Sequence, residues 1–299
     1  MCVYLHYRLP PNDNIHVIVS VRFAACLEMN EAPIVTLTTD WGDRDFFAAM
    51  VKGRLCSYIP NVRVFDVSHH LRWDDLMTSM NAIRFGCLSF PQGTVHIVDV
   101  GCDMSHSGPP EPLAIRSGGH CFVCNDRRLM ELSLDMGCDE AVNLTVPESI
   151  AFRTFLAHDL FCDVVRRILN GESLSSMGQP CADFRTHKRP SAQPDGNSLV
   201  AVVTNVDSYG NANLNITHSE FEAIRAGRRF RLDIGNSFRY DDRTEPVQHV
   251  RSHYNEVRMG NIVLTVSATG YLQIALNKTS ASKLLSLNPT SQCVFTFME

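Results

Sequence analysis

The chain has 299 residues, of which 44% are hydrophobic and 20% are charged, and its formal net charge at pH 7 is -5. This length exceeds the usual size of one domain, so we expect two domains of an ordinary globular protein. The negative charge and the short Lys/Arg groupings argue against a nucleic-acid partner, because phosphate-binding surfaces need concentrated positive charge.

Residues 1–31 read as an extension that we do not expect to belong to the fold. Its apolar stretch, from Ile15 to Leu27, carries Arg22 and is too short to cross a bilayer. The Phe23 to Cys26 segment is faintly similar to a lipoprotein cleavage site, which would imply export. The alternative is that Met29 is the natural start of the protein, which would then be cytoplasmic. We expect this second alternative. No later segment approaches membrane length, so no membrane partner is expected.

The 11 cysteines are scattered, and Cys121 and Cys124 form the only Cys-x-x-Cys pair. A structural zinc site would need a second pair or two histidines at ligand spacing. We therefore expect no metal and free thiols in a reducing cytosol.

The first part of the chain alternates between short apolar β-rich runs and amphipathic helical runs. In chain order these are a strand at 34–39, a helix at 46–59, a strand at 62–67, a helix at 73–88 and a strand at 94–100. Such alternation with short connections predicts an α/β domain with a mainly parallel sheet, over residues 32–180. Parallel sheets place ligand groups at the carboxyl ends of their strands, where Asp40, 68–70 and 99–103 fall.

A different pattern follows a last helix, expected from 152 to about 170. Residues 181–198 contain turn residues and little apolar periodicity, which indicates a linker. In residues 199–299, short β-like runs are separated by turns. This pattern predicts an all-β domain, either a barrel or a sandwich. These runs lie at 199–205, 213–217, 230–234, 261–266, 271–277 and 292–297.

Asp40 is the first candidate ligand-binding residue, since a carboxylate can accept hydrogen bonds from both hydroxyls of a ribose. It could equally cap the next helix. Trp73 follows a strand end, where an aromatic ring could stack on a nucleobase or simply pack against the helix.

Two turn segments in the second domain are further candidates. The segment from Asp207 to Asn211 offers a stacking face at Tyr209 and an amide at Asn211, although its composition also suits a plain hairpin turn. The Ser267 to Gly270 segment has the same two interpretations. No Walker loop, dinucleotide fingerprint or nucleophile-elbow motif is present.

Taken together, five segments resemble one family in order and rough spacing. The family is the S-adenosylmethionine (SAM) hydroxide adenosyltransferases, or SAM hydrolases, which are relatives of the SAM-dependent fluorinase and chlorinase. The segments are 36–42, 65–69, 93–96, 207–211 and 267–277, and the likeness extends from about residue 33 to the end. It implies an α/β domain and a β-barrel, in a homotrimer with active sites between subunits. SAM would be the substrate, and no cofactor is implied.

The resemblance also implies roles for individual residues. Asp40 would hold the ribose diol, with Trp41 beside it and Trp73 walling the pocket. Residues of the barrel domain would contact the adenine or the methionine portion of SAM, and these are Asp207, Tyr209, Asn211 and Ser267.

This sequence departs from the family where water is activated. The family's Asp, Arg and His set falls on Gly101, Pro112 and Leu156. Nearby ionisable residues could replace it, and we take Asp99, Asp103 and His158 as the candidate catalytic set. His106 and Arg116 are further candidates.

Two functions therefore stay open. One is a SAM hydrolase with a rearranged water-activating set, and the other is a non-catalytic protein that binds SAM or adenosine. A halogenase is disfavoured, because Ala157 stands where the fluorinase has a halide-contacting serine.

Overall fold

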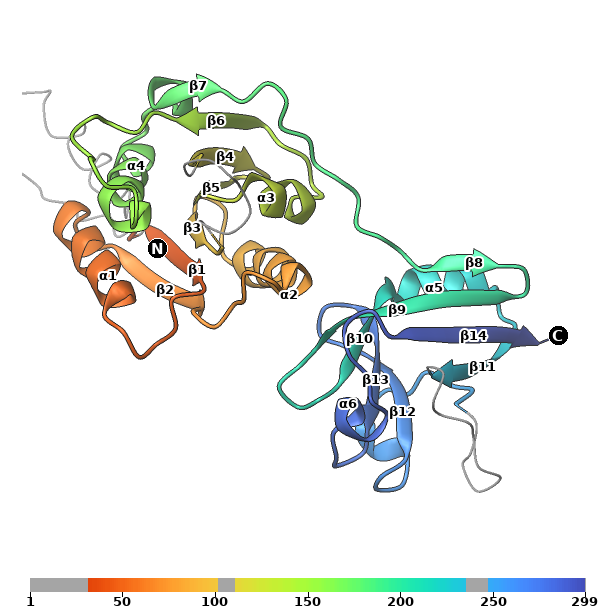
Figure 1. Cartoon of the computed structure of the whole chain (residues 1–299). Coiled ribbons are helices and arrows are strands. Elements are labelled where there is room, and N and C mark those ends of the chain that lie inside the picture. The colour runs from red at the N-terminus through yellow and green to blue at the C-terminus, as the bar shows by residue number, and fades with distance from the viewer. Residues whose placement is uncertain (1–31, 102–110, 235–246, 299) are drawn as a thin grey trace, which may run out of the picture.

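The computed structural model describes residues 32–101, 111–234 and 247–298, which fold into two domains (Figure 1). The N-terminal domain is built on a seven-stranded sheet with the order β2-β1-β3-β5-β4-β6-β7. Its strands are β1 (Ile34–Thr39), β2 (Arg63–Ser68), β3 (Val95–Asp99), β4 (Leu113–Ser117), β5 (His120–Cys124), β6 (Glu140–Leu144) and β7 (Gly178–Pro180). β2, β1, β3 and β5 are parallel, whereas β4, β6 and β7 pair antiparallel. The α/β class is confirmed, with the parallel strands in one half of a mixed sheet.

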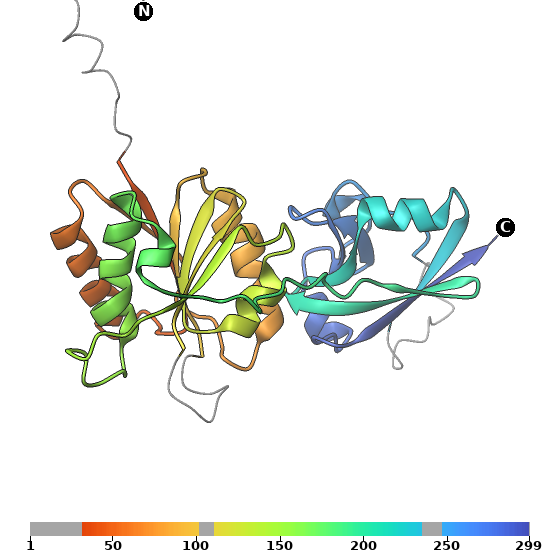
Figure 2. The same cartoon turned by 90° about the horizontal axis from the view of Figure 1, so that it is seen from above.

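Helices cover both faces of this sheet and make three layers (Figure 2). One face is covered by α1 (Phe47–Tyr58) and by α4 (Cys162–Leu169), which the π-helical turn η4 (Ala157–Phe161) precedes. The other is covered by α2 (Leu76–Asn81) and α3 (Arg127–Ser133). α2 continues through η2 (Ala82–Gly86) and η3 (Cys87–Ser89).

The strands expected at 34–39, 62–67 and 94–100 and the helix at 46–59 are confirmed to within two residues. The helix expected from residue 73 begins later, at Leu76. Asp75 precedes it and accepts a hydrogen bond from the Thr78 backbone N–H over 3.0 Å, so the carboxylate marks the start of the helix.

The strands and the helix between residues 111 and 144 were not predicted from the sequence. There, β4 and β5 form a hairpin closed by Gly118 and Gly119, both with positive φ. Only glycine adopts such a pair of conformations readily. β4 therefore enters the sheet antiparallel beside β5.

The C-terminal domain is an antiparallel sheet with the order β11-β14-β9-β10-β13-β12, and β8 pairs with β9. It curls into a half-barrel around its own apolar core, which confirms the all-β prediction. The strands are β8 (Gln193–Asp195), β9 (Ser198–Val206), β10 (Ala212–Thr217), β11 (Arg229–Ile234), β12 (Ile262–Val266), β13 (Tyr271–Leu276) and β14 (Gln292–Met298). Short helices join them: α5 (His218–Arg225), η6 (Tyr254–Glu256) and α6 (Ala281–Leu284). β8 lies inside the expected linker, because Gly196, at φ 55°, turns the chain into a hairpin with β9.

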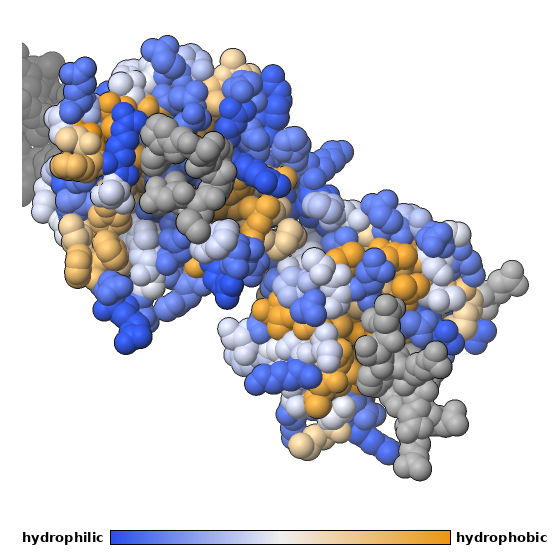
Figure 3. Space-filling view, in the orientation of Figure 1, coloured by the Kyte–Doolittle hydropathy of each residue, from blue (hydrophilic) through white to orange (hydrophobic). Residues whose placement is uncertain are grey.

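The two domains appear as separate lobes joined by a narrow waist (Figure 3). At this waist the Asn81 amide donates to Asn205 Oδ1 over 3.1 Å, and the Phe85 ring meets the Tyr271 ring edge-on. Arg189 lies over Tyr271 at 4.6 Å and pairs with Glu220 at 2.6 Å. Within the described ranges, no helix has the length and apolar character needed to cross a membrane. The extension at residues 1–31 lies outside the described residues.

Candidate active site

Asp40 directly follows β1, at the carboxyl end of the parallel strands. Its Oδ2 accepts a hydrogen bond from the backbone N–H of Gly101 over 2.9 Å, while Oδ1 has no hydrogen-bond partner among the described residues. α1 begins only at Phe47, and its N-cap residue Phe46 makes no side-chain cap bond, so Asp40 does not cap this helix. One carboxylate oxygen is thus anchored and the other can accept a ligand's hydroxyl group.

A chain of polar groups, buried at Thr39 and His69 and exposed at Asp66, supports the turn that carries Asp40. The Thr39 hydroxyl lies 2.6 Å from His69 Nδ1, and His69 Nε2 lies 3.0 Å from Asp66 Oδ1. This second contact is an ion-pair distance with poor hydrogen-bond alignment. Burial alone would raise the pKa of Asp66, but the hydrogen bond and charge of Lys52, together with the neighbouring His69, outweigh it and lower that pKa. The ends of β1 and β2 are thereby fastened together.

Asp99, at the end of β3, lies behind Trp41 and is only 3% exposed. Its Oδ2 accepts from Trp41 Nε1 over 3.0 Å, and its Oδ1 accepts from Asn125 Nδ2 over 2.9 Å. The Trp41 ring stacks on His69 at 5.9 Å and meets the edge of Phe155 at 5.2 Å. The predicted residues Asp40, Trp41 and Asp99 therefore lie together at one edge of the sheet.

Trp73 reaches the same edge from the loop before α2, with 58% of its surface exposed. Gly101 packs against it: a Cβ placed on Gly101 would lie 3.2 Å from Trp73 Cβ. Gly101 also has φ +66°, which disfavours any other residue.

His158 does not join this group. Its Nδ1 lies 2.7 Å from Asp159 Oδ1 and 3.2 Å from Arg54 Nη1. Phe155 contacts both it and Trp41, stacking on the His158 ring at 6.0 Å. His158 thus belongs to a polar cluster over α1.

Arg116 lies at the opposite end of the sheet, because β4 runs antiparallel and Arg116 pairs with Cys121 at the beginning of β5. Asp103 and His106 lie outside the described residues.

The three positions that the sequence resemblance aligns with a water-activating set carry no ionisable side chain. Leu156 is buried in the apolar core between the sheet and α4, and Pro112 is also buried. Gly101 serves as the hydrogen-bond donor to Asp40.

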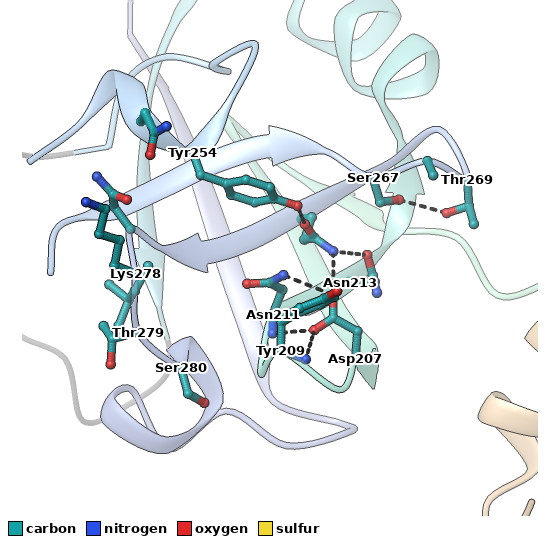
Figure 4. Close-up of a pocket in the computed structure, with 15 residues that line it drawn as sticks. Asp207, Tyr209, Asn211, Asn213, Tyr254, Ser267, Thr269, Lys278, Thr279 and Ser280 are labelled. Carbon is teal, nitrogen blue, oxygen red and sulfur yellow. Dashed lines mark hydrogen bonds between the residues drawn. The ribbon is translucent and has the colours of Figure 1, made fainter. Parts of the chain in front are cut away.

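The second group of predicted residues lines an open hollow of about 880 Å³ in the barrel domain (Figure 4). Asp207 organises its floor: Oδ1 accepts from the backbone N–H groups of Tyr209 and Asn211, each over 2.9 Å. The Asn211 amide donates to Asp207 Oδ2 over 3.0 Å. Tyr209 is 83% exposed at the rim, and the Ser267 hydroxyl bonds to Thr269 over 2.7 Å.

Sequence reasoning missed two residues of this hollow. Gln273, only 3% exposed, donates to Asp207 Oδ2 over 3.2 Å and to Asn213 Oδ1 over 3.0 Å. The Tyr254 hydroxyl donates to Gln273 Oε1 over 2.7 Å. The available signal was a glutamine within the otherwise apolar Leu272 to Leu276 run.

The hollow is lined by barrel residues alone, so Asp40, Trp41 and Trp73 take no part in it. No group of three or more His, Cys, Asp or Glu side chains in the described ranges could hold a metal ion.

Comparison with known proteins assigns both domains to models of one family. The SAM hydroxide adenosyltransferase N-terminal domain matches residues 35–178, and the C-terminal domain of the same family matches residues 201–294. An (R)-S-adenosyl-L-methionine hydrolase of Salinispora arenicola is 28% identical, over 88% of this chain and 98% of its own length. A fluorinase of Nocardia brasiliensis is 23% identical, over 83% and 91% respectively. A solved structure of an uncharacterized conserved protein from Thermotoga maritima superposes with a TM-score of 0.74 at 20% identity, covering 88% of this chain and 99% of that one.

Proposed function

The chain belongs to the SAM hydroxide adenosyltransferase family, and from this membership we propose that it hydrolyses S-adenosylmethionine to adenosine and L-methionine. Hydrolases of this name among its relatives support the proposal. The structural observation that carries it is the placement of Asp40. Its carboxylate is anchored to Gly101 through Oδ2 and has Oδ1 available for a ribose hydroxyl. Release of adenosine and methionine from SAM by the purified protein tests it.

The reaction is a displacement at the ribose 5′ carbon. The oxygen of water attacks this carbon while the carbon–sulfur bond breaks, and the bonding electrons go to sulfur. Methionine leaves as a neutral thioether, and the proton lost by the attacking water passes to solvent. Because the sulfonium is already a good leaving group, the protein has to orient the reactants and exclude bulk water. No cofactor or metal is needed for this step.

The substrate-binding set divides between the domains. Asp40, Trp41 and Trp73 would meet the ribose from the α/β domain. The polar groups of the barrel hollow would meet the adenine or the methionine portion, and we assign Asp207, Tyr209, Asn211 and Ser267 to that role. The dense hydrogen bonding around Asp207 supports it, since a rigid turn presents its free polar groups in fixed directions.

The candidate catalytic residues are supported unevenly. Asp99 lies beside the Asp40 turn, but both of its oxygens accept hydrogen bonds from neighbouring side chains. His158 faces Arg54 and Asp159. Asp103 stays a proposal from the sequence alone.

We further propose a homotrimer in which the barrel hollow of one subunit faces the Asp40 turn of its neighbour. The hollow's purely barrel lining supports this, since a complete site needs both groups. Apolar side chains are exposed on both lobes (Figure 3), among them Phe46 and Phe152 on the α/β domain and Met259 and Leu284 on the barrel domain, as expected of surfaces that a partner covers. A cytoplasmic location is also proposed, and the free thiols of the described cysteines agree with it.

A second candidate function is a non-catalytic SAM or adenosine binder. One observation favours it: the positions that match the family's water-activating set hold Gly101, Pro112 and Leu156. In that case the protein binds the adenosyl ligand tightly and releases no adenosine above the uncatalysed background.

A further inference from the structure

Asp99 is a buried carboxylate, and each of its oxygens accepts a hydrogen bond from a neutral side chain. Trp41 Nε1 donates to Oδ2 over 3.0 Å and Asn125 Nδ2 donates to Oδ1 over 2.9 Å. An indole N–H can only donate, so the direction of the first bond does not depend on any tautomer. The Asn125 amide must present its NH₂ to the carboxylate, although this leaves Asn125 Oδ1 buried with no partner in the described parts of the chain. Such a cost indicates that the amide is oriented to serve Asp99.

Three neighbouring side chains hold the Trp41 ring in place. Asp99 fixes its N–H end, His69 stacks on its face with an interplanar angle of 16°, and Phe155 meets it edge-on. His69 is itself held by Thr39 at 2.6 Å. A half-buried indole directly next to Asp40 in the chain is therefore fixed before any ligand arrives.

We infer that Asp99 is a positioning residue that acts through Trp41, and that Trp41 is the rigid wall against which the adenosyl group is bound. The inference rests on the proposed function for the identity of the ligand. It assigns Asp99 no proton transfer, in contrast to the catalytic role that its nearness to the family's acidic position, at Gly101, first indicated. A preorganised wall improves binding because no side-chain freedom remains to be lost when the ligand docks.

A double-mutant cycle between Asp99→Asn and Trp41→Phe tests the inference. Binding is measured by calorimetry with S-adenosylhomocysteine, whose neutral thioether is not a leaving group, so that no turnover occurs. If Asp99 acts through Trp41, Asp99→Asn weakens binding about tenfold in the parent protein and less than about twofold in the Trp41→Phe background. Asp183→Asn, which removes an exposed carboxylate paired with Arg127, is the matched control and leaves binding unchanged.

A direct catalytic role for Asp99 gives a different result. Binding then stays the same, kcat falls by roughly a hundredfold or more in both backgrounds, and the acid limb of the pH–rate profile disappears. That outcome overturns the inference. Asn125→Ala provides a second route: it removes one donor to Asp99, and it weakens binding in the parent protein but not in the Trp41→Phe background.

A ligand-free measurement separates failure of this inference from failure of the proposed function. The chain has 2 tryptophans, so Trp73→Phe leaves Trp41 as the only one. In that background Asp99→Asn shifts the tryptophan emission to the red and increases quenching by acrylamide if Asp99 holds the indole. Unchanged emission and quenching overturn the positioning role. If the parent protein binds neither SAM nor S-adenosylhomocysteine, the proposed function fails, and the fluorescence result still decides whether Asp99 positions Trp41.

Discussion

Asp40 Oδ2 accepts a hydrogen bond from the Gly101 backbone N–H over 2.9 Å, which ties the ends of the neighbouring parallel strands β1 and β3 together. The sequence resemblance aligns Gly101 with an acidic residue of the family. In this chain that position carries no side chain that could act on water, and its backbone N–H orients the proposed ribose-binding carboxylate. The residues proposed for substrate binding differ from those proposed for water activation, so the two roles can be tested separately.

Replacing Asp40 by alanine removes the proposed acceptor for the ribose hydroxyls. Loss of hydrogen bonds to a charged group costs roughly 1.5–3 kcal/mol, so we expect S-adenosylhomocysteine to bind about ten- to a hundredfold more weakly. Calorimetry measures this. The control is Asp43→Ala, a nearby carboxylate with 70% of its side chain exposed. Equal binding by Asp40→Ala and the parent protein would remove Asp40 from the site.

Gly101→Ala tests the contact between the β3 end and Trp73. The substitution forces a side chain into φ +66° and places its Cβ 3.2 Å from Trp73 Cβ. Gly93→Ala is the matched control, because φ there is +86° but the space around it is open. Backbone strain costs about 1–3 kcal/mol at either site. We therefore expect both variants to be less stable to urea and only Gly101→Ala to bind the ligand more weakly.

Gln273→Leu should disrupt the floor of the barrel hollow. It leaves Asp207, Asn213 and Tyr254 each without one hydrogen bond. Because each lost hydrogen bond costs about 0.5–1.5 kcal/mol net, the urea midpoint should fall clearly. Gln193→Leu, at an exposed position that donates only to the Ser191 carbonyl, should leave the midpoint unchanged. Similar midpoints for the two variants would contradict this network.

The fold should lose stability in acid through His96. Burial, and secondarily the neighbouring His120, lower the pKa of His96 from 6.5 to about 3. The unfolded chain therefore takes up a proton below pH 6.5 that the folded state refuses, so stability is full above pH 6.5 and falls as the pH is lowered towards 3. One such group contributes about 1.4 kcal/mol per pH unit in that window.

Urea unfolding from pH 7.5 down to pH 4 measures this slope. His96→Gln should reduce it by about one proton. An unaltered slope in His96→Gln would show that other groups cause the acid sensitivity.

Light scattering on a sizing column tests the proposed assembly. A homotrimer of the 33.5 kDa chain has a mass of about 100 kDa. A monomer that nevertheless binds the ligand with full affinity would show that one subunit completes the site.

The sequence predicted elements well where a single strong pattern governs them. The strands β1 and β3 are buried on both faces and therefore appear as apolar runs. The barrel strands bury one face, so apolar and polar residues alternate along them, and both patterns are clear in the sequence. The hairpin of β4 and β5 was missed because its pairing is decided by two adjacent glycines, Gly118 and Gly119, more than by hydrophobic periodicity.

Site residues were likewise predictable where the local sequence marks them. Asp40 and Asp207 stand in turn segments directly after strands, where sequence alone draws attention to them. Asn125 and Gln273 could not be foreseen, because their roles depend on partners 26 and 66 residues away in the chain. His158 was predicted from an alignment register, whereas the packing of Phe155 places it in a separate cluster with Arg54.

Turnover of SAM in heavy-oxygen water tests the central claim most directly. If the protein catalyses displacement by water at the 5′ carbon, it forms adenosine and methionine in equal amounts, and the heavy oxygen appears in the adenosine 5′ hydroxyl by mass spectrometry. The Asp40→Ala variant, assayed in parallel, should form far less of both products. Tight binding of SAM with no labelled adenosine above the protein-free background would contradict hydrolysis and would leave the chain as a binder of the adenosyl group.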